Sequence, residues 1–161
     1  MPVALERGGR ADQGDVSRLE EIIGKPVDAQ FRAFLTQNDG AVPEANSFPV
    51  NGVAYVGGVN GFIRLKDIPS ERALIDDIGT RAYPIADSEG GNYVILDEDQ
   101  GGAIFFWDHE VEGGLYRIAD NFDAFLEMLQ PFDPDSVSLS PDQVESAWID
   151  PSFLKQFGNK S

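Results

Sequence analysis

The stretch that decides the fold runs from Ile85 to Glu110 and reads IADSEGGNYVILDEDQGGAIFFWDHE. It contains two short apolar runs, residues 93–96 and residues 103–107, and a polar segment separates them. Both runs are rich in β-branched and aromatic residues and are bounded by Gly and Asp, so the pattern predicts strands rather than helix. Neither run alternates between apolar and polar residues, which favours strands covered on both faces. The sequence therefore predicts a β-hairpin in the middle of a sheet.

The turns that flank this hairpin have a distinctive composition. Gly91 and Asn92 precede the first strand, and Gly102 precedes the second. Each glycine lies where a strand begins after a turn, so we expect Gly91 or Gly102 to adopt a backbone conformation that a β-carbon disfavours. Trp107 and His109 follow at the end of the second strand, and we expect His109 to hydrogen-bond to backbone there. These five residues are predicted to be structural.

Apolar residues at helical spacing predict four helices around the hairpin. The expected ranges are 16–23, 28–37, 70–78, and a helix that Asp120 or Asn121 caps and that reaches Gln130. Ser17 and Glu20 form a possible capping box in the first helix, and Gly24 can end that helix in a left-handed conformation.

Further strands are predicted over residues 47–55, 61–65, 83–86 and 115–119. The apolar faces of these elements are expected to meet in one buried cluster. Its predicted members are Phe31, Phe34, Leu35, Ile95, Phe105, Phe122, Phe125 and Leu126.

The 161 residues suit one domain with a terminal segment on each side. Residues 1–14, which are rich in Gly, Arg and Asp, are predicted to be disordered, and residues 15–130 to form the domain. Residues 131–161 are predicted to be a helical extension that packs on the domain. Their apolar side chains, Trp148 and Phe153 among them, could instead form a contact in a weak homodimer.

Charge is the strongest signal in the composition. The chain has 28 acidic and 12 basic residues, a formal net charge of −16, and from Asp97 onward we count 14 acidic against 3 basic residues. Such a surface repels nucleic acid and anionic lipid and attracts basic proteins, although acidity also serves solubility alone. The chain has no Cys, no signal-peptide core and no apolar run of about 20 residues, so we expect a cytoplasmic protein without disulfides.

Three catalytic or metal-binding patterns are incomplete. His109-Glu110 begins like a zinc-protease helix, but it is the only histidine and a second one is required. The Gly-x-Ser-x-Gly nucleophile elbow is absent. Asp97, Asp99 and Asp108 occupy positions one, three and twelve of an EF-hand-like loop, but Gly101 replaces the ligand at position five and the bidentate Glu is missing. We therefore expect no enzyme activity, no metal and no cofactor.

The order of several motifs resembles a known family. The motifs are Pro26…Phe31…Phe34-Leu35…Asn38-Asp39-Gly40…Pro43, Pro84-Ile85-Ala86-Asp87…Gly91-Asn92, Gly102…Ile104-Phe105…Trp107-Asp108-His109-Glu110, and Ile118-Ala119…Phe122…Phe125-Leu126…Leu129. Over Val16 to Gln130 the chain resembles the SUKH superfamily, which includes fungal regulators of cell-wall glucan synthesis and bacterial toxin-immunity proteins. It departs from the pattern at Asp39, where a second Gly is common. The resemblance implies an α+β fold, with a single domain in which helices pack against a curved, mostly antiparallel central sheet, and a non-catalytic binding role.

Two classes of function follow for the sequence. The first is an immunity protein that neutralises a basic toxin domain, and the second is a regulatory or scaffold protein that docks a cellular partner. In either case we expect the acidic rim of the central hairpin to bind the protein partner, with Tyr93, Trp107 or Tyr116 as apolar anchors if they are exposed. The predicted rim residues are Asp87, Glu89, Asp97, Glu98, Asp99, Asp108, Glu110 and Glu112.

Overall fold

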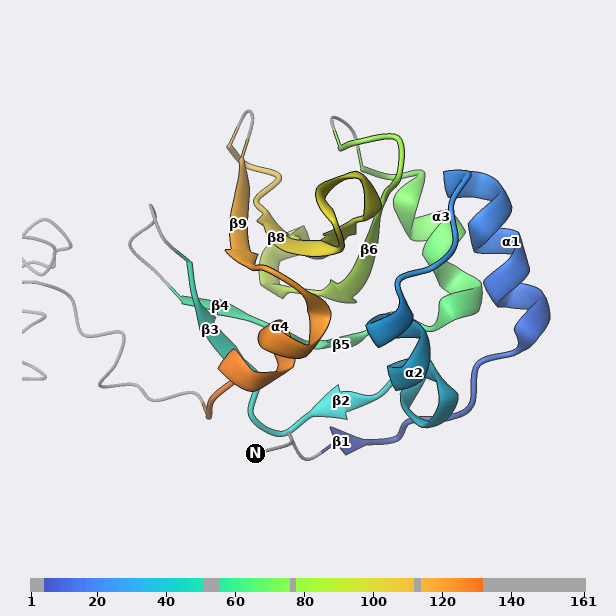
Figure 1. Cartoon of the computed structure of the whole chain (residues 1–161). Coiled ribbons are helices and arrows are strands. Elements are labelled where there is room, and N and C mark those ends of the chain that lie inside the picture. The colour runs from blue at the N-terminus through green and yellow to red at the C-terminus, as the bar shows by residue number, and fades with distance from the viewer. Residues whose placement is uncertain (1–4, 51–55, 76–77, 112–113, 132–161) are drawn as a thin grey trace, which may run out of the picture.

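A computed structural model describes residues 5–50, 56–75, 78–111 and 114–131, which Figure 1 shows in colour. Its centre is an antiparallel five-stranded sheet in the order β5-β6-β7-β8-β9. These strands are β5 (Gly61–Phe62), β6 (Ala82–Asp87), β7 (Tyr93–Asp97), β8 (Ala103–Trp107) and β9 (Leu115–Ala119). The predicted hairpin is the β7–β8 pair in the middle of this sheet.

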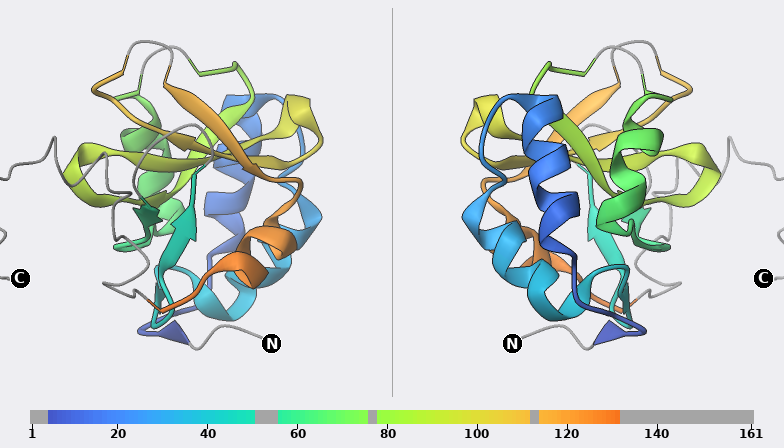
Figure 2. Two further views of the ribbon diagram at one scale, coloured as in Figure 1. Left: turned by 90° about the vertical axis from the view of Figure 1, so that its left-hand side faces the viewer. Right: turned by 90° about the vertical axis from the view of Figure 1, so that its right-hand side faces the viewer.

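Helices and two small strand pairs surround the sheet. The helices are α1 (Gln13–Ile23), α2 (Ala29–Asn38), α3 (Ile68–Arg72) and α4 (Phe122–Met128), with 3-10 turns η1 (Leu65–Asp67), η2 (Glu89–Gly91) and η3 (Glu98–Gln100). β1 (Leu5–Glu6) pairs with β2 (Val42–Pro43), and β3 (Ser47–Pro49) pairs with β4 (Val56–Gly58). Figure 2 shows α2 and α4 packed side by side, with α3 against β6. The predicted α+β architecture with an antiparallel central sheet is confirmed.

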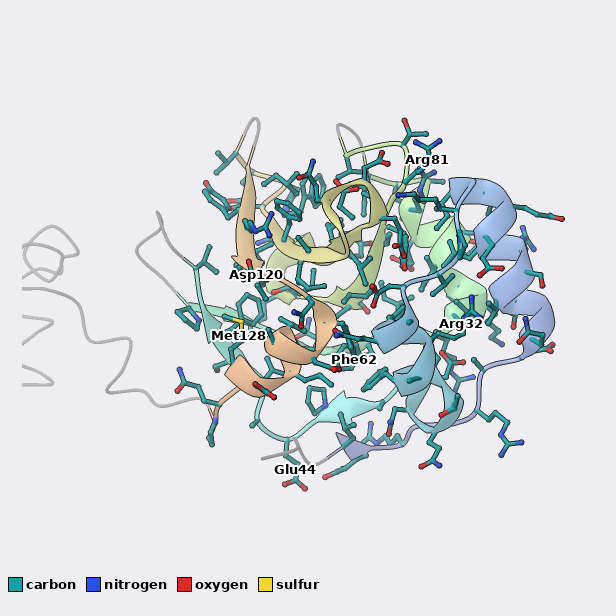
Figure 3. The ribbon with its side chains drawn as sticks, in the orientation of Figure 1. Arg32, Glu44, Phe62, Arg81, Asp120 and Met128 are labelled. Carbon is teal, nitrogen blue, oxygen red and sulfur yellow. The ribbon has the colours of Figure 1, made fainter. Side chains whose placement is uncertain are left out.

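The sheet separates two apolar clusters. The larger cluster contains Val94, Leu96, Ile104 and Phe106 from the hairpin, packed with the buried faces of α1, α2 and α4. Aromatic rings fill its centre: Phe62, which lies between α2 and α4 in Figure 3, has its ring centroid 4.8 Å from that of Phe34 and 6.1 Å from that of Phe122. Edge-to-face and tilted ring pairs at these separations add to the burial of apolar area.

The second cluster lies on the opposite face of the sheet. Ile95 packs there with Ile75 and Ala82, and Phe105 and Trp107 are partly buried against it. Phe31, Phe34, Leu35, Phe122 and Phe125 are buried in the larger cluster as predicted, and Leu126 packs partly buried against it. The prediction of one cluster is wrong for Ile95 and Phe105, because adjacent residues of a strand point to opposite faces of a sheet.

Several element boundaries differ from the sequence predictions. α1 begins at Gln13 behind the N-cap Asp12, whose carboxylate accepts a hydrogen bond from Gly14 N, and not at the predicted Ser17 capping box. The carboxylate of Glu20 instead accepts hydrogen bonds from Val27 N (2.9 Å) and Arg32 Nη2 (2.6 Å). Gly24 ends α1 in the left-handed conformation, as predicted.

The structure also differs from the predictions for the N-terminal segment and for α3. Residues 5–14, which belong to the segment predicted to be disordered, contain β1, a bridge from Gly9 to Asp39 and the start of α1. α3 ends at Arg72, short of the predicted Ile78, and Leu74 beyond its end is 71% exposed. The helix and packing predicted for residues 132–161 lie outside the described residues.

Candidate functional site

The predicted acidic rim lies at two opposite ends of the sheet. In an antiparallel meander, the β6–β7 and β8–β9 connections lie at one end and the β7–β8 connection lies at the other. The five residues of β7 separate the two ends by about 15 Å, at roughly 3.3 Å per residue. We call the first the acidic end, with the exposed carboxylates of Asp87, Glu89 and Glu110, and the second the loop end, with Asp97, Glu98 and Asp99.

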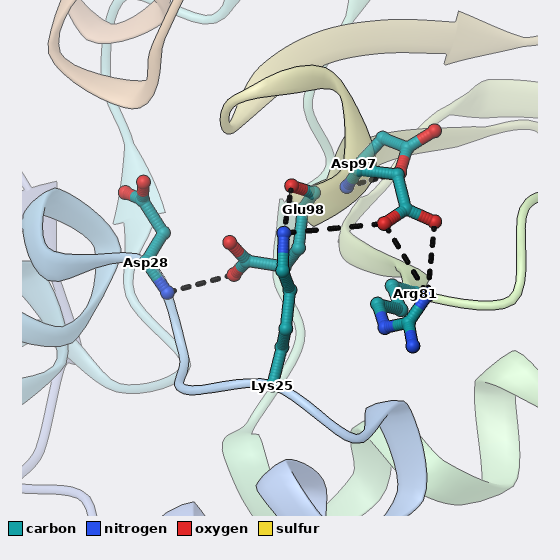
Figure 4. Close-up of polar contacts among 6 residues, drawn as sticks. Lys25, Asp28, Arg81, Asp97 and Glu98 are labelled. Atoms are coloured by element: carbon teal, nitrogen blue, oxygen red, sulfur yellow. Dashed lines mark hydrogen bonds and ion pairs between the residues drawn. The ribbon is translucent and has the colours of Figure 1, made fainter.

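Glu98 at the loop end is an internal group. Its Oε2 accepts a hydrogen bond from Asp28 N at 2.7 Å, and its backbone carbonyl accepts one from Lys25 Nζ at 3.1 Å (Figure 4). Oε2 also accepts a hydrogen bond from the Tyr83 hydroxyl at 2.7 Å. Burial raises the pKa of the Glu98 carboxyl group, and the hydrogen bonds from Tyr83 and Asp28 lower it by less. The Glu98 side chain connects the β7–β8 turn to the start of α2. It is therefore buried, whereas the sequence predicted an exposed rim residue.

Asp97 and Asp99 are also engaged within the domain. Asp97 is 8% exposed and its Oδ1 accepts a hydrogen bond from Asp99 N at 2.9 Å, so it shapes the turn. Asp99 is exposed, but its carboxylate forms ion pairs with Arg81 at 3.4 Å and with Lys25 at 3.9 Å. Among these three residues, the loop end therefore offers a partner no carboxylate that is both exposed and without an ion pair.

Gly102 allows this turn to lie close to the start of α2, because it has no β-carbon. Its φ is +85°, and a β-carbon there would lie 2.6 Å from Oδ1 of Asp28, the residue that caps α2. Gly91 has φ +89°, and a β-carbon there would lie 3.3 Å from the His109 ring. The prediction that Gly91 or Gly102 adopts a conformation unfavourable to other residues is confirmed at both positions.

Three of the predicted structural residues meet at the acidic end. Asn92 Oδ1 accepts a hydrogen bond from His109 N at 3.0 Å and lies 2.7 Å from His109 Nδ1, and Gly91 packs against the same ring. The partner of His109 is thus the Asn92 side chain and not the backbone that the sequence predicted. This contact joins the β6–β7 turn to the β8–β9 turn, and so fixes the backbone next to the carboxylates of this end.

The predicted carboxylates of the acidic end have different environments. Asp87, Glu89 and Glu110 are exposed, and the Glu110 side chain, 78% exposed, lies 4.0 Å from His109 Nε2. Asp108 is 7% exposed and its Oδ1 accepts a hydrogen bond from Glu110 N at 3.0 Å, so it belongs to the turn. Glu112 lies outside the described residues.

Four neighbouring side chains, two of them aromatic, form a row across one face of the sheet, and Asp87 is at one end of it. The strand register pairs Asp87 with Tyr93, Tyr93 with Trp107, and Trp107 with Leu115, so the four side chains lie on one face. The ring centroids of Tyr93 and Trp107 are 6.0 Å apart, and Tyr93, Trp107 and Leu115 are partly exposed. We call Asp87, Tyr93, Trp107 and Leu115 the aromatic row.

Glu71 from α3 adds a second carboxylate to the row. It accepts a hydrogen bond from the Tyr93 hydroxyl. Partial burial and the negative charge of Glu71 raise the pKa of Asp87, and burial together with the Glu71 hydrogen bond raises the pKa of Tyr93. Sequence reasoning missed Glu71, since it lies 22 residues before Tyr93 and only the packing of α3 on β6 brings the two together. Tyr116, a predicted anchor, packs instead against the larger core cluster.

The described residues show neither of two other kinds of site. Among them, no group of three or more His, Asp or Glu side chains is arranged to hold a metal ion. No helix built from them has both the length and the apolar character required to cross a bilayer.

The five-stranded antiparallel sheet, with helices packed on it and carboxylates held at one end, defines an α+β domain of the SUKH type. The sequence model of the SMI1 / KNR4 family (SUKH-1) matches residues 10–128, and the chain belongs to this family. The resemblance found in the motifs is thereby confirmed. The chain is also similar to the SPbeta prophage-derived uncharacterized protein YokK of Bacillus subtilis strain 168, at 28% identity over 74% of this chain and 76% of that protein.

Proposed function

We propose that this protein is a non-catalytic binding module of the cytoplasm, an immunity protein that neutralises a cationic toxin by binding it. Membership of the SUKH-1 family supports this class of function, as does similarity to a prophage-derived protein. The observation that carries the proposal is the acidic end. Asp87, Glu89 and Glu110 are exposed there, and among the described residues no lysine or arginine forms an ion pair with them.

The acidic end is suited to a partner that carries positive charge. A formal net charge of −16 accelerates the encounter with a basic protein at low salt. The Asn92–His109 contact holds the two turns before a partner arrives, so little ordering entropy is lost on binding. A toxin that uses basic residues to bind phosphates would meet carboxylates in their place and lose access to its substrate.

A regulatory or scaffold role is the second candidate, because the same acidic end would also dock a basic cellular protein. The two candidates differ in the gene that lies next to this one. An immunity gene is expected directly downstream of a large toxin gene with a variable C-terminal domain.

The test expresses the basic C-terminal domain encoded next door from an inducible promoter, with and without this protein. We expect wild-type protein to restore growth and the triple variant D87K/E89K/E110K to lose most of that protection. The matched control E21K/E44K/E127K reverses three other exposed carboxylates and should protect like the wild type. Wild-type protein that neither binds the domain nor restores growth would contradict the immunity function. Capture of a basic host protein by the acidic end would then favour the scaffold function.

A further inference from the structure

We propose that the sheet face with the aromatic row is a docking surface for an arginine side chain of a basic protein partner. The apolar stem of that arginine lies over Trp107, and its guanidinium group reaches the carboxylates of Glu71 and Asp87. The inference rests on the proposed function, binding of a basic partner, and adds the chemistry by which one residue of that partner is recognised.

The register of the sheet gives the surface its length. Asp87, Tyr93 and Trp107 are direct neighbours on three successive strands, and strands lie about 4.8 Å apart, so the row spans roughly 10 Å. An extended arginine side chain covers most of this length. With the guanidinium group at the Asp87 end, the methylene stem therefore passes over Tyr93 and reaches the indole of Trp107.

The charge on this surface is unbalanced. Glu71 accepts the hydrogen bond of the Tyr93 hydroxyl group, and Asp87 is the neighbour of Tyr93 on β6, so the two carboxylates lie near the same ring. Burial and the negative charge of Glu71 raise the pKa of Asp87. Among the described residues, no lysine or arginine forms an ion pair with either carboxylate, whereas Asp99 pairs with Lys25 and Arg81 and Glu20 pairs with Arg32. A cation supplied by a partner would provide the missing charge.

The apolar part of the surface is incompletely covered. Ile75 and Ile78 pack on Ile95 at the centre of this face, but Tyr93 and Trp107 stay partly exposed. On the far side of Trp107 the face continues to the partly exposed Leu115. Tyr and Trp side chains are enriched in protein interfaces and among the residues that contribute most of the binding energy.

These features favour arginine over lysine. The guanidinium group is planar, stacks on an aromatic face, and presents several N–H donors that can engage two carboxylates at once. The lysine ammonium group is compact and strongly hydrated, so it gains less from contact with the Tyr93 ring that lies beside the two carboxylates. The surface is therefore expected to discriminate between two peptides of equal charge.

The test uses the full chain with Trp148→Phe, which leaves Trp107 as the single tryptophan. Hexa-arginine amide, hexa-lysine amide and neutral hexa-citrulline amide are titrated at low salt while Trp107 fluorescence and the amide and indole NMR signals are followed. We expect hexa-arginine to shift the Trp107 indole signal and to bind at least about 5-fold more tightly than hexa-lysine, because stacking adds to charge. Hexa-citrulline should produce no shift.

Two double variants of equal charge separate a specific surface from general acidity. E71Q/D87N removes the two carboxylates beside Tyr93 and should weaken hexa-arginine binding about 10-fold or more, as loss of charge-assisted bonds does. E21Q/E127Q neutralises two exposed carboxylates elsewhere and should weaken it less than about 2-fold, as loss of a distant exposed charge does. The E71Q substitution keeps an acceptor for the Tyr93 hydroxyl, and circular dichroism verifies that each variant is folded.

The outcomes distinguish this inference from the proposed function. Equal weakening by both double variants, or a Trp107 signal that no peptide moves, would overturn the docking surface. Growth protection that survives E71Q/D87N would also overturn it and leave the immunity function standing. A toxin that this protein fails to neutralise would contradict the immunity function, while a selective effect of E71Q/D87N on hexa-arginine would still support the surface.

Discussion

The hydroxyl group of Tyr83 donates a hydrogen bond to the Glu98 carboxylate across 2.7 Å, inside the domain. Tyr83 lies in β6 and is fully buried, and Glu98 begins the turn that joins β7 to β8. The same carboxylate accepts the backbone N–H of Asp28, 70 residues away in the chain. The Glu98 side chain therefore connects β6, the turn of the central hairpin and the start of α2.

Replacing Gly102 by Val should destabilise the domain by about 1–3 kcal/mol, because φ is +85° and the new β-carbon would meet Asp28 Oδ1 at 2.6 Å. Urea unfolding measures the loss. Gly101→Val is the matched control, since Gly101 has φ +72° but no atom within 4 Å of a β-carbon. Gly102→Val should cost more than Gly101→Val, and equal losses would argue against a contact that holds the turn on α2.

Truncating Phe125 to Ala should lower the free energy of unfolding by about 3–5 kcal/mol. The side chain is fully buried, and its ring centroid lies 5.6 Å from that of Phe48 and 6.5 Å from that of Phe62. Leu74→Ala, at a side chain that is 71% exposed, should change stability by less than about 0.5 kcal/mol. Losses of similar size in the two variants would contradict the packing of α4 on the sheet.

The stability that Glu98 contributes should depend on pH, because burial raises its pKa in the folded protein. The folded state then holds a proton that the unfolded chain, with a pKa of about 4.3, has released. This contribution is fully present below about pH 4.3 and is lost as pH rises through the raised folded-state pKa. Urea unfolding of the wild type and of Glu98→Gln from about pH 4 to 7 measures it as the difference between them, which should fall as pH rises.

Tyr83→Phe provides a second measurement of the same group. The Tyr83 hydroxyl lowers the Glu98 pKa by donating to the carboxylate, so its removal should extend the loss of stability to higher pH. A difference between wild type and Glu98→Gln that stays constant, or that grows with pH, would contradict an internal Glu98 carboxyl group.

Reversing the charges of Asp87, Glu89 and Glu110 to Lys should slow association with the basic partner about 10-fold or more at low salt. Release should change less, because charge complementarity acts mainly on encounter, and the effect should shrink as salt rises. Stopped-flow kinetics measures both rates, with E21K/E44K/E127K as the variant of equal charge; Glu44 points away from the domain in Figure 3. Equal slowing by the two triple variants would place the binding surface elsewhere.

Local signals in the sequence determined much of the fold. The apolar runs predict β7 and β8, Gly24 is identified as a helix cap, and Asn121 is one of the two residues predicted to cap α4. Five core aromatic and aliphatic residues of α2 and α4 are also predicted correctly in the buried cluster. These features follow from backbone conformations and periodicities that neighbouring residues set, so the chain alone reveals them. The order of the motifs was also sufficient to predict the family.

Only the tertiary structure decided which carboxylates a partner can reach. Asp97, Glu98 and Asp99 are adjacent in sequence, yet their side chains have different partners. Asp97 accepts a hydrogen bond within the turn, Glu98 accepts one from the buried Tyr83 hydroxyl, and Asp99 forms an ion pair with Arg81. Glu71 acquires a role only because α3 packs against β6 and brings it to Tyr93. The solvation and pairing of a charged side chain depend on the elements that pack against it, and these come from distant parts of the chain. The residues next to it in sequence therefore do not determine whether a partner can reach it.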